Sequence, residues 1–240
     1  DRAPRANLVL LGGEPTLHPD LARIIKAARR RGFKSVTVDT NGGLFHDLLA
    51  KITPRDLDYL SFSLDGATPE TNDAIRGQGS YELCLSGLRA ALSKGFSTSL
   101  IYTVSRRNIY ELSRMGPLLE ALGVRRFFIQ VIGIRGKSAC DPSDPLQVSK
   151  DLWLATVPAA AEEIARRGIR VIYPKVFLDS GENFECAGRV AENFFIFPNG
   201  RVYRCPLGED YPLHSLRIED GRLIETDPIN EAHLFQLDIP

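Results

Sequence analysis

Short apolar runs alternate with stretches of helical pattern along most of this chain, and this alternation limits the fold more than any other feature. Each run has the length and composition of a buried strand, as NLVLL does at residues 7–11. We predict strands at residues 7–11, 34–39, 59–64, 97–104, 126–132 and 169–173. We predict helices at residues 19–31, 44–51, 81–94 (with Ser80 as N-cap), 109–122 and 149–167.

Strands that alternate with helices pair in parallel, because each connection has to cross over the sheet. A barrel and a doubly wound sheet both satisfy this pattern. After about residue 173 the pattern changes, and Asn199-Gly200 between two short runs predicts a β-hairpin. A second hairpin is expected over residues 218–224. We therefore expect two domains, an α/β core over residues 1–180 and a small β-rich module over residues 181–240.

The composition excludes several classes of protein. In the 240 residues, 30 Lys and Arg balance 30 Asp and Glu, so net charge gives no argument for binding nucleic acid or an anionic membrane. No apolar run approaches the roughly 20 residues of a membrane helix. Four cysteines are too few for a disulfide scaffold in a chain of this length.

Glycines and small polar residues follow three successive predicted strands. The motifs are GGEP at residues 12–15, DTNGG at 39–43 and SFSLDG at 61–66. Parallel strands place their carboxyl ends on one edge of the sheet, where α/β proteins bind their ligands. Taken alone, GGEP indicates a tight turn with a capping glutamate. Three such strand ends in register favour a polar ligand site.

A basic residue follows the third motif, in NDAIRG at residues 72–77. The guanidinium of Arg76 could bind a carboxylate with two parallel hydrogen bonds. A surface salt bridge to Asp73 or Glu70 is an equally good interpretation of the local sequence.

The four motifs, in this order and spacing, resemble those of the radical S-adenosylmethionine (SAM) superfamily. The resemblance covers about residues 7–137. It implies an α/β fold, a partial (β/α)6 barrel that lacks its first βα unit here, followed by a small C-terminal β-hairpin module. It also implies SAM and a [4Fe–4S] cluster as cofactors.

The resemblance assigns roles to individual residues. The GGE segment binds the amino group of SAM, the serine of the third motif contacts SAM, and the following arginine pairs with the SAM carboxylate. Thr40 and Asn41 are expected at the same edge, near the ribose. The expected SAM-binding residues are Gly12, Gly13, Glu14, Pro15, Thr40, Asn41, Ser63, Asp65, Arg76, Asn108 and Ile132.

One defining motif of the family is absent. None of the four cysteines has the C-x-x-x-C-x-x-C spacing that supplies three thiolates to the cluster. In the family this motif precedes GGEP by a few tens of residues, and here only 11 residues precede Gly12. We expect the cluster ligands to lie outside this chain, and we expect this polypeptide alone to be inactive in cleaving SAM.

Two cysteines bracket the predicted hairpin in the tail. The order along the chain is Cys186, 13 residues, Gly200, four residues and Cys205. This spacing resembles the opening of a SPASM module, which is an auxiliary-cluster extension of radical SAM enzymes. Thiolates suit an iron–sulfur cluster, so Cys186 and Cys205 are the predicted metal ligands of an auxiliary [4Fe–4S] cluster. Two unrelated buried cysteines are the alternative.

The resemblance implies an enzyme that cleaves SAM reductively to a 5′-deoxyadenosyl radical, which abstracts hydrogen from a peptide or protein side chain. The alternatives are a molybdenum-cofactor-type radical SAM enzyme that acts on a nucleotide, and a non-catalytic barrel that lost its cluster. An unrelated phosphate-binding barrel is disfavoured, because no glycine-rich loop follows residues 169–173. Expected partners are a peptide or small-molecule substrate and an electron donor such as flavodoxin or ferredoxin, with no nucleic acid and no membrane. The expected location is the cytoplasm.

Overall fold

The computed structural model of the chain describes residues 6–43, 47–133, 145–179, 181–182, 193–203 and 216–226. The chain divides into two compact units, Asp1–Val176 and Phe177–Pro240. Among the described residues, no helix is both long and apolar enough to span a membrane.

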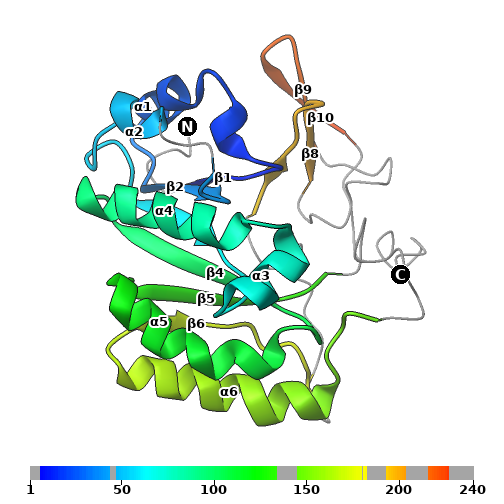
Figure 1. Ribbon diagram of the computed structural model, residues 1–240. Coiled ribbons are helices and arrows are strands. Elements are labelled where there is room, and N and C mark those ends of the chain that lie inside the picture. The colour runs from blue at the N-terminus through cyan, green and yellow to red at the C-terminus, as the bar shows by residue number, and fades with distance from the viewer. Residues whose placement is uncertain are drawn as a thin grey trace. The chain divides into compact units, whose positions relative to one another are not determined.

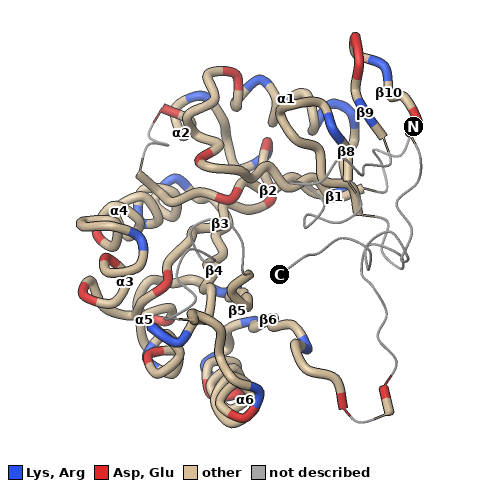
Figure 2. Tube along the Cα trace, turned by 90° about the vertical axis from the view of Figure 1, so that its right-hand side faces the viewer, with Lys and Arg blue, Asp and Glu red and all other residues tan. Residues whose placement is uncertain are grey.

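The first unit is built on a six-stranded parallel sheet whose spatial order follows the sequence (Figure 1). Its strands are β1 (Asn7–Leu10), β2 (Ser35–Thr40), β3 (Tyr59–Ser63), β4 (Thr98–Val104), β5 (Arg126–Val131) and β6 (Arg170–Ile172). Figure 2 shows the strands along an arc with the helices on its outer side. Sequential strands with helices on one side form a partial barrel, so the structure confirms the barrel and excludes the doubly wound sheet.

Side chains of the strands alternate between the two faces of this sheet. The convex face lies under the helices and forms an apolar core, and its members with 0% exposure include Val36, Val38, Leu60, Phe62, Leu100 and Tyr102. The opposite positions, on the concave face, carry mostly polar side chains, among them Asp39, Ser61, Ser63, Ser99 and Thr103. Any ligand that lies inside the arc therefore meets polar groups.

The outer layer consists of helices and two short 3-10 segments. They are η2 (Pro15–Leu17), α1 (Leu21–Arg30), α2 (Leu48–Lys51), α3 (Pro69–Arg76), α4 (Ser80–Ser93), η3 (Ile109–Arg114), α5 (Met115–Leu122) and α6 (Lys150–Arg166). The helix α3 was not expected from the sequence. It begins at Pro69, with Thr68 as an N-cap whose hydroxyl accepts from the Thr71 amide, and this Thr-Pro start is the signal that could have predicted it.

Several expected helix boundaries were wrong, and α2 covers only the last four residues of the helix expected over residues 44–51. Ser80 is the first residue of α4, and Gly79 at φ +79° occupies the N-cap position. The single helix expected over residues 109–122 is η3 followed by α5. Pro117 lacks an amide hydrogen and its ring would collide with the Ser113 carbonyl, so an α-helix cannot continue regularly through this point.

The second unit contains a four-stranded antiparallel sheet of two hairpins, in the order β10-β9-β8-β7. Its strands are β7 (Phe195–Ile196), β8 (Arg201–Tyr203), β9 (Leu216–Glu219) and β10 (Arg222–Glu225). Gly200 has φ +81°, and a Cβ there would lie 2.7 Å from the Ile218 carbonyl oxygen, so only glycine fits this turn. Both predicted hairpins, and with them the small β module, are confirmed.

Candidate cofactor-binding site

Glu14 joins the first strand end to the second. Its Oε1 accepts hydrogen bonds from the Thr16 amide (3.0 Å), the Thr16 hydroxyl (2.7 Å) and the Thr40 hydroxyl (2.8 Å), and its Oε2 accepts from the Asn41 amide (2.7 Å). Three residues predicted for the site, Glu14, Thr40 and Asn41, are thus brought together. Oε2 has room for a second donor, such as an ammonium group.

The backbone beside Glu14 is open. Gly12 and Gly13 are exposed, and a Cβ built on either would meet no atom within 4 Å. Gly12 has φ +149°, which L-residues rarely adopt. Pro15 starts the 3-10 segment η2, for which Glu14 is the N-cap. A ligand can therefore approach the main chain of GGEP directly, as the sequence predicts.

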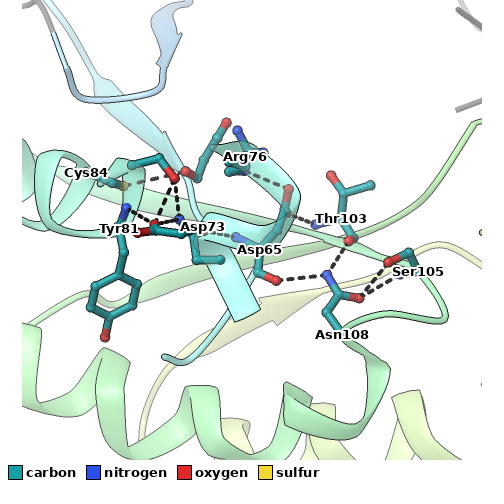
Figure 3. Close-up of polar contacts among 11 residues, drawn as sticks. Asp65, Asp73, Arg76, Tyr81, Cys84, Thr103, Ser105 and Asn108 are labelled. Carbon is teal, nitrogen blue, oxygen red and sulfur yellow. Dashed lines mark hydrogen bonds and ion pairs between the residues drawn. The ribbon is translucent and has the colours of Figure 1, made fainter. Parts of the chain in front are cut away.

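Arg76 is held by Asp65 (Figure 3), and not by Asp73 or Glu70 as the local sequence allowed. Its Nε lies 2.7 Å from Asp65 Oδ2, and Asp65 Oδ1 accepts from the Thr103 amide at 2.7 Å. The two terminal guanidinium nitrogens make no hydrogen bond to any described residue. Asp65, which is 5% exposed, therefore positions Arg76, and the outer side of the guanidinium can receive a carboxylate.

Asp73 serves a different purpose, in the turn between α3 and α4. It accepts hydrogen bonds from the Tyr81 amide (2.8 Å), the Gly79 amide (2.7 Å) and the Ser80 hydroxyl (3.1 Å). These bonds, the one from the Tyr81 amide most, hold the pKa of Asp73 below its ordinary value of 3.8. The turn fixes the carboxyl end of α3, where Arg76 lies.

Asn108 is buried, with 1% exposure, and its amide group is fully used (Figure 3). Nδ2 donates to the carbonyls of Asp65 and Thr103, both at 2.9 Å, while Oδ1 accepts from the Ser105 amide and hydroxyl. All the hydrogen-bonding capacity of the side chain is therefore spent inside the protein. The geometry gives Asn108 the role of connecting strand ends, and its amide has no group left for the SAM contact suggested by the resemblance.

The remaining predicted residues lie at the same edge. Ser63 ends β3, is half-buried, and its carbonyl accepts a hydrogen bond from the Cys84 thiol at 3.5 Å. Ile132 follows β5, is half-buried, and donates its amide to the Val104 carbonyl. Both residues are only partly buried, so a ligand at this edge can contact them.

The part of the chain that the structure describes offers no ligand set for a metal. No cluster of three or more His, Cys, Asp or Glu side chains occurs among these residues. Cys84 is the one cysteine described, and burial raises the pKa of its thiol to about 12, which disfavours the thiolate that binds iron. Cys140, Cys186 and Cys205 lie outside the described residues, so the predicted pair is not placed.

Sequence reasoning missed a polar row on the concave face. Asp39 on β2 hydrogen-bonds Ser61 on β3, whose hydroxyl lies 2.5 Å from that of Ser99 on β4. Burial raises the pKa of Asp39 from 3.8 to about 6, although the bond to Ser61 opposes this. The signal was the polar residues at alternate positions of β2 and β3, which mark the face that helices do not cover.

Asp39→Asn is expected to stabilise the chain at neutral pH. Between pH 4 and 6 the folded state binds more protons at Asp39 than the unfolded state does, so stability falls as the pH rises through this window. Asparagine does not ionise, so the variant should not lose stability in this pH window. Its free energy of unfolding should exceed that of the wild type by about 2 kcal/mol at pH 7.5 and by little at pH 4.

Urea denaturation at the two pH values measures this difference. Asp56→Asn is the control, because hydrogen bonding from the Thr53 amide lowers the pKa of Asp56, so that variant should lose stability above pH 4. A difference between Asp39→Asn and wild type that is the same at both pH values contradicts the assignment.

A curved parallel sheet has here a carboxylate and open glycine backbone at its strand ends and the guanidinium of Arg76 at the end of α3. Such an arrangement is the ligand-binding edge of a partial (β/α)-barrel enzyme. Residues 1–113 match the family model of the radical SAM superfamily. The first 113 residues are thus similar to this superfamily, whose members use SAM and a [4Fe–4S] cluster.

Individual relatives differ in the reactions their names describe. The probable GTP 3′,8-cyclase of Saccharolobus islandicus (strain M.14.25 / Kamchatka #1) is 28% identical over 228 residues, which are 90% of this chain and 72% of the cyclase. The mycofactocin maturase MftC of Mycobacterium ulcerans (strain Agy99) is 30% identical over 213 residues, which are 81% of this chain and 54% of MftC. This chain thus spans about half the length of the maturase.

Solved structures support the fold. Streptococcus suis SuiB bound to S-adenosylmethionine superposes with a TM-score of 0.68 at 13% identity, covering 86% of this chain and 51% of SuiB. At this identity the similarity establishes the partial barrel and no residue roles.

Proposed function

We propose that this chain is the SAM-binding core of a radical SAM enzyme that modifies a peptide or protein side chain. The observation that carries the SAM site is the guanidinium of Arg76, fixed through Nε by Asp65 with both terminal nitrogens open. Glu14 and the exposed backbone of Gly12 and Gly13 lie at the same edge of the sheet and supply acceptors for an ammonium group. A methionyl group carries both charges.

The residues of this chain bind and orient. The carbonyls of GGEP and Oε2 of Glu14 accept hydrogen bonds from the amino group, Arg76 pairs with the carboxylate, and Ser63 contacts SAM on the concave side. Thr40 and Asn41 hold Glu14 in place and border the ribose. When bound, SAM supplies with a reduced cluster the 5′-deoxyadenosyl radical that abstracts hydrogen from the substrate. The described residues include no ligand set for the cluster.

A peptide is the favoured substrate. MftC, named as a maturase, is 30% identical to this chain, and the β7–β8 hairpin lies in sequence between Cys186 and Cys205, as in the SPASM-like pattern. We propose that these cysteines hold an auxiliary cluster in a module over residues 181–240, and that a small electron-transfer protein reduces the enzyme. The cyclase similarity makes a nucleotide the second candidate, and tight binding of GTP would favour it.

The test of the SAM site compares SAM with decarboxylated SAM, which lacks only the carboxylate. Isothermal titration of the wild type should show SAM binding about tenfold more tightly, the difference that a bidentate guanidinium pair supplies. Arg76→Lys keeps the charge and the pairing with Asp65 but loses the planar fork. Its preference for SAM should fall to about threefold or less.

Arg114→Lys is the matched control, since Arg114 forms a surface ion pair with Glu111 at 2.9 Å. It should keep the tenfold preference. If wild type binds the two compounds equally, or if Arg76→Lys and Arg114→Lys behave alike, Arg76 does not receive the carboxylate and the proposed site is wrong.

A further inference from the structure

A row of polar side chains crosses the concave face of the sheet at one level. The ladder pairs Asp39 with Ser61 and Ser61 with Ser99. Leu100 pairs with Phe127, which puts Ser99 level with Arg126, and Arg126 pairs with Arg170 on β6. The row thus has a carboxylate on one side and two guanidinium groups on the other.

Arg126 extends over an aromatic floor. Its guanidinium carbon lies 3.9 Å from the ring centroid of Tyr59 and 5.2 Å from that of Phe128. Tyr59 is on β3, two strands away, so the side chain of Arg126 extends across β4. Stacking of this kind fixes a cation without neutralising it.

The charge of Arg126 is not balanced within the described part of the chain. Its Nε is buried without a hydrogen-bond partner, and no described carboxylate forms an ion pair with it. By contrast, Arg29, Arg76 and Arg167 each pair with an Asp or Glu. Asp39, at the other end of the row on β2, hydrogen-bonds Ser61 and forms no ion pair with Arg126.

Arg170 adds a second positive charge at this end of the sheet. Arg170 is its register partner on the adjacent parallel strand, so both side chains leave the same face. Like charges opposite each other in a sheet are destabilising. The guanidinium of Arg126 itself extends the other way, toward β3, and without a described counter-ion it suits an oxyanion, which a guanidinium group binds with paired hydrogen bonds.

We propose that Arg126 binds an oxyanion of the substrate, a carboxylate or a phosphate, on the concave face, where Arg170 adds positive potential at the same end of the sheet. This inference rests on the proposed function, in which the substrate lies inside the arc. Both arginines begin their strands, about 16 Å along the strand from the edge where SAM is proposed to bind. The substrate is therefore elongated, with its reacting carbon near the edge and its anionic group near the opposite end of the sheet.

The experiment uses two simple probes, succinate for carboxylate and pyrophosphate for phosphate, at low ionic strength. At saturating concentration, at least one probe should raise the unfolding temperature of the wild type, by about 3 °C. Arg126→Gln should lose most of this shift and bind the probe at least about tenfold more weakly by isothermal titration. Arg125→Gln, an exposed neighbour with the same change of charge, should respond like the wild type.

Each outcome bears on the proposal. A response to succinate alone assigns a carboxylate, and a response to pyrophosphate alone assigns a phosphate. No response of the wild type to either probe, or an equal loss in Arg125→Gln and Arg126→Gln, overturns it. In anion-free buffer the unfolding temperature of Arg126→Gln should lie within about 2 °C of the wild type, because the variant loses the stacking on Tyr59 but also an unbalanced buried charge, whereas a purely structural stacking role predicts a larger decrease.

Failure of this inference is separable from failure of the SAM site. Arg126→Gln should keep the preference for SAM over decarboxylated SAM, because that preference depends on Arg76. Arg126→Lys keeps the charge without the planar fork, and its intermediate affinity for the probe would show that the paired geometry contributes.

Discussion

Replacing Gly66 with alanine is expected to lower the free energy of unfolding by about 3 kcal/mol and to weaken SAM binding at the same time. A Cβ at this position would lie 2.4 Å from the Asn72 amide nitrogen, 2.9 Å from its Cα and 3.0 Å from the Thr71 carbonyl carbon. These are backbone atoms of α3, which cannot rotate away as a side chain would. The helix has to move, and Arg76 moves with it away from Asp65.

Urea denaturation and isothermal titration with SAM measure the two effects. Gly133→Ala is the control, since a Cβ on Gly133 meets nothing within 4 Å and its backbone angle suits any residue. It should leave stability within about 0.5 kcal/mol of the wild type. Wild-type stability in Gly66→Ala would mean that α3 does not pack against this glycine.

The second large effect is expected from Asn108→Asp, which changes the shape of the side chain hardly at all. A carboxylate can still accept from Ser105, but it cannot donate to the carbonyls of Asp65 and Thr103, and it places a charge in a buried position. We expect a loss of about 4 kcal/mol at pH 7.5.

The loss should shrink as the pH falls. Burial favours the neutral acid, so the introduced carboxyl should titrate at a higher pH in the folded state than in the unfolded state, and stability should rise as the pH drops through that range. The protonated carboxyl can then donate to one of the two carbonyls. Thermal unfolding at pH 5 and 7.5 tests this.

Asn7→Asp serves as the control for Asn108→Asp. Asn7 is exposed, and its Oδ1 accepts from the Ser35 hydroxyl at 2.8 Å, a bond that a carboxylate keeps. It should change stability little at either pH. Equal behaviour of the two variants would show that the donor hydrogens of Asn108 are unimportant.

The order of elements followed from the sequence because hydrophobic periodicity is a local property. Residues 59–64 and 97–104 predict buried strands without knowledge of their neighbours, and the structure confirms them as β3 and β4 with small shifts at the ends. The choice between barrel and doubly wound sheet could not be made in the same way. It depends on which side of the sheet each helix covers, and no local pattern records that.

The candidate site was likewise predictable only where its signal is local in the sequence. The motifs placed Glu14 at a strand end and Arg76 after the third strand, but the partner of Arg76 was not predictable, because Asp73 and Glu70 are nearer in sequence than Asp65. The choice is made by the turn after α3, which uses the oxygens of Asp73 for three donors. Asn108 was predicted from its position near a strand end to contact SAM. Its side-chain amide instead makes all its hydrogen bonds to protein groups and connects neighbouring strands.

The buried thiol of Cys84 has a practical consequence for chemical labelling. With 1% exposure and a pKa raised to about 12, it carries almost no thiolate at the pH where iodoacetamide or maleimide reacts. In the folded chain Cys84 should therefore remain unalkylated. Any modification detected by mass spectrometry under native conditions then reports on Cys140, Cys186 and Cys205, so their protection by bound iron can be followed without removing Cys84.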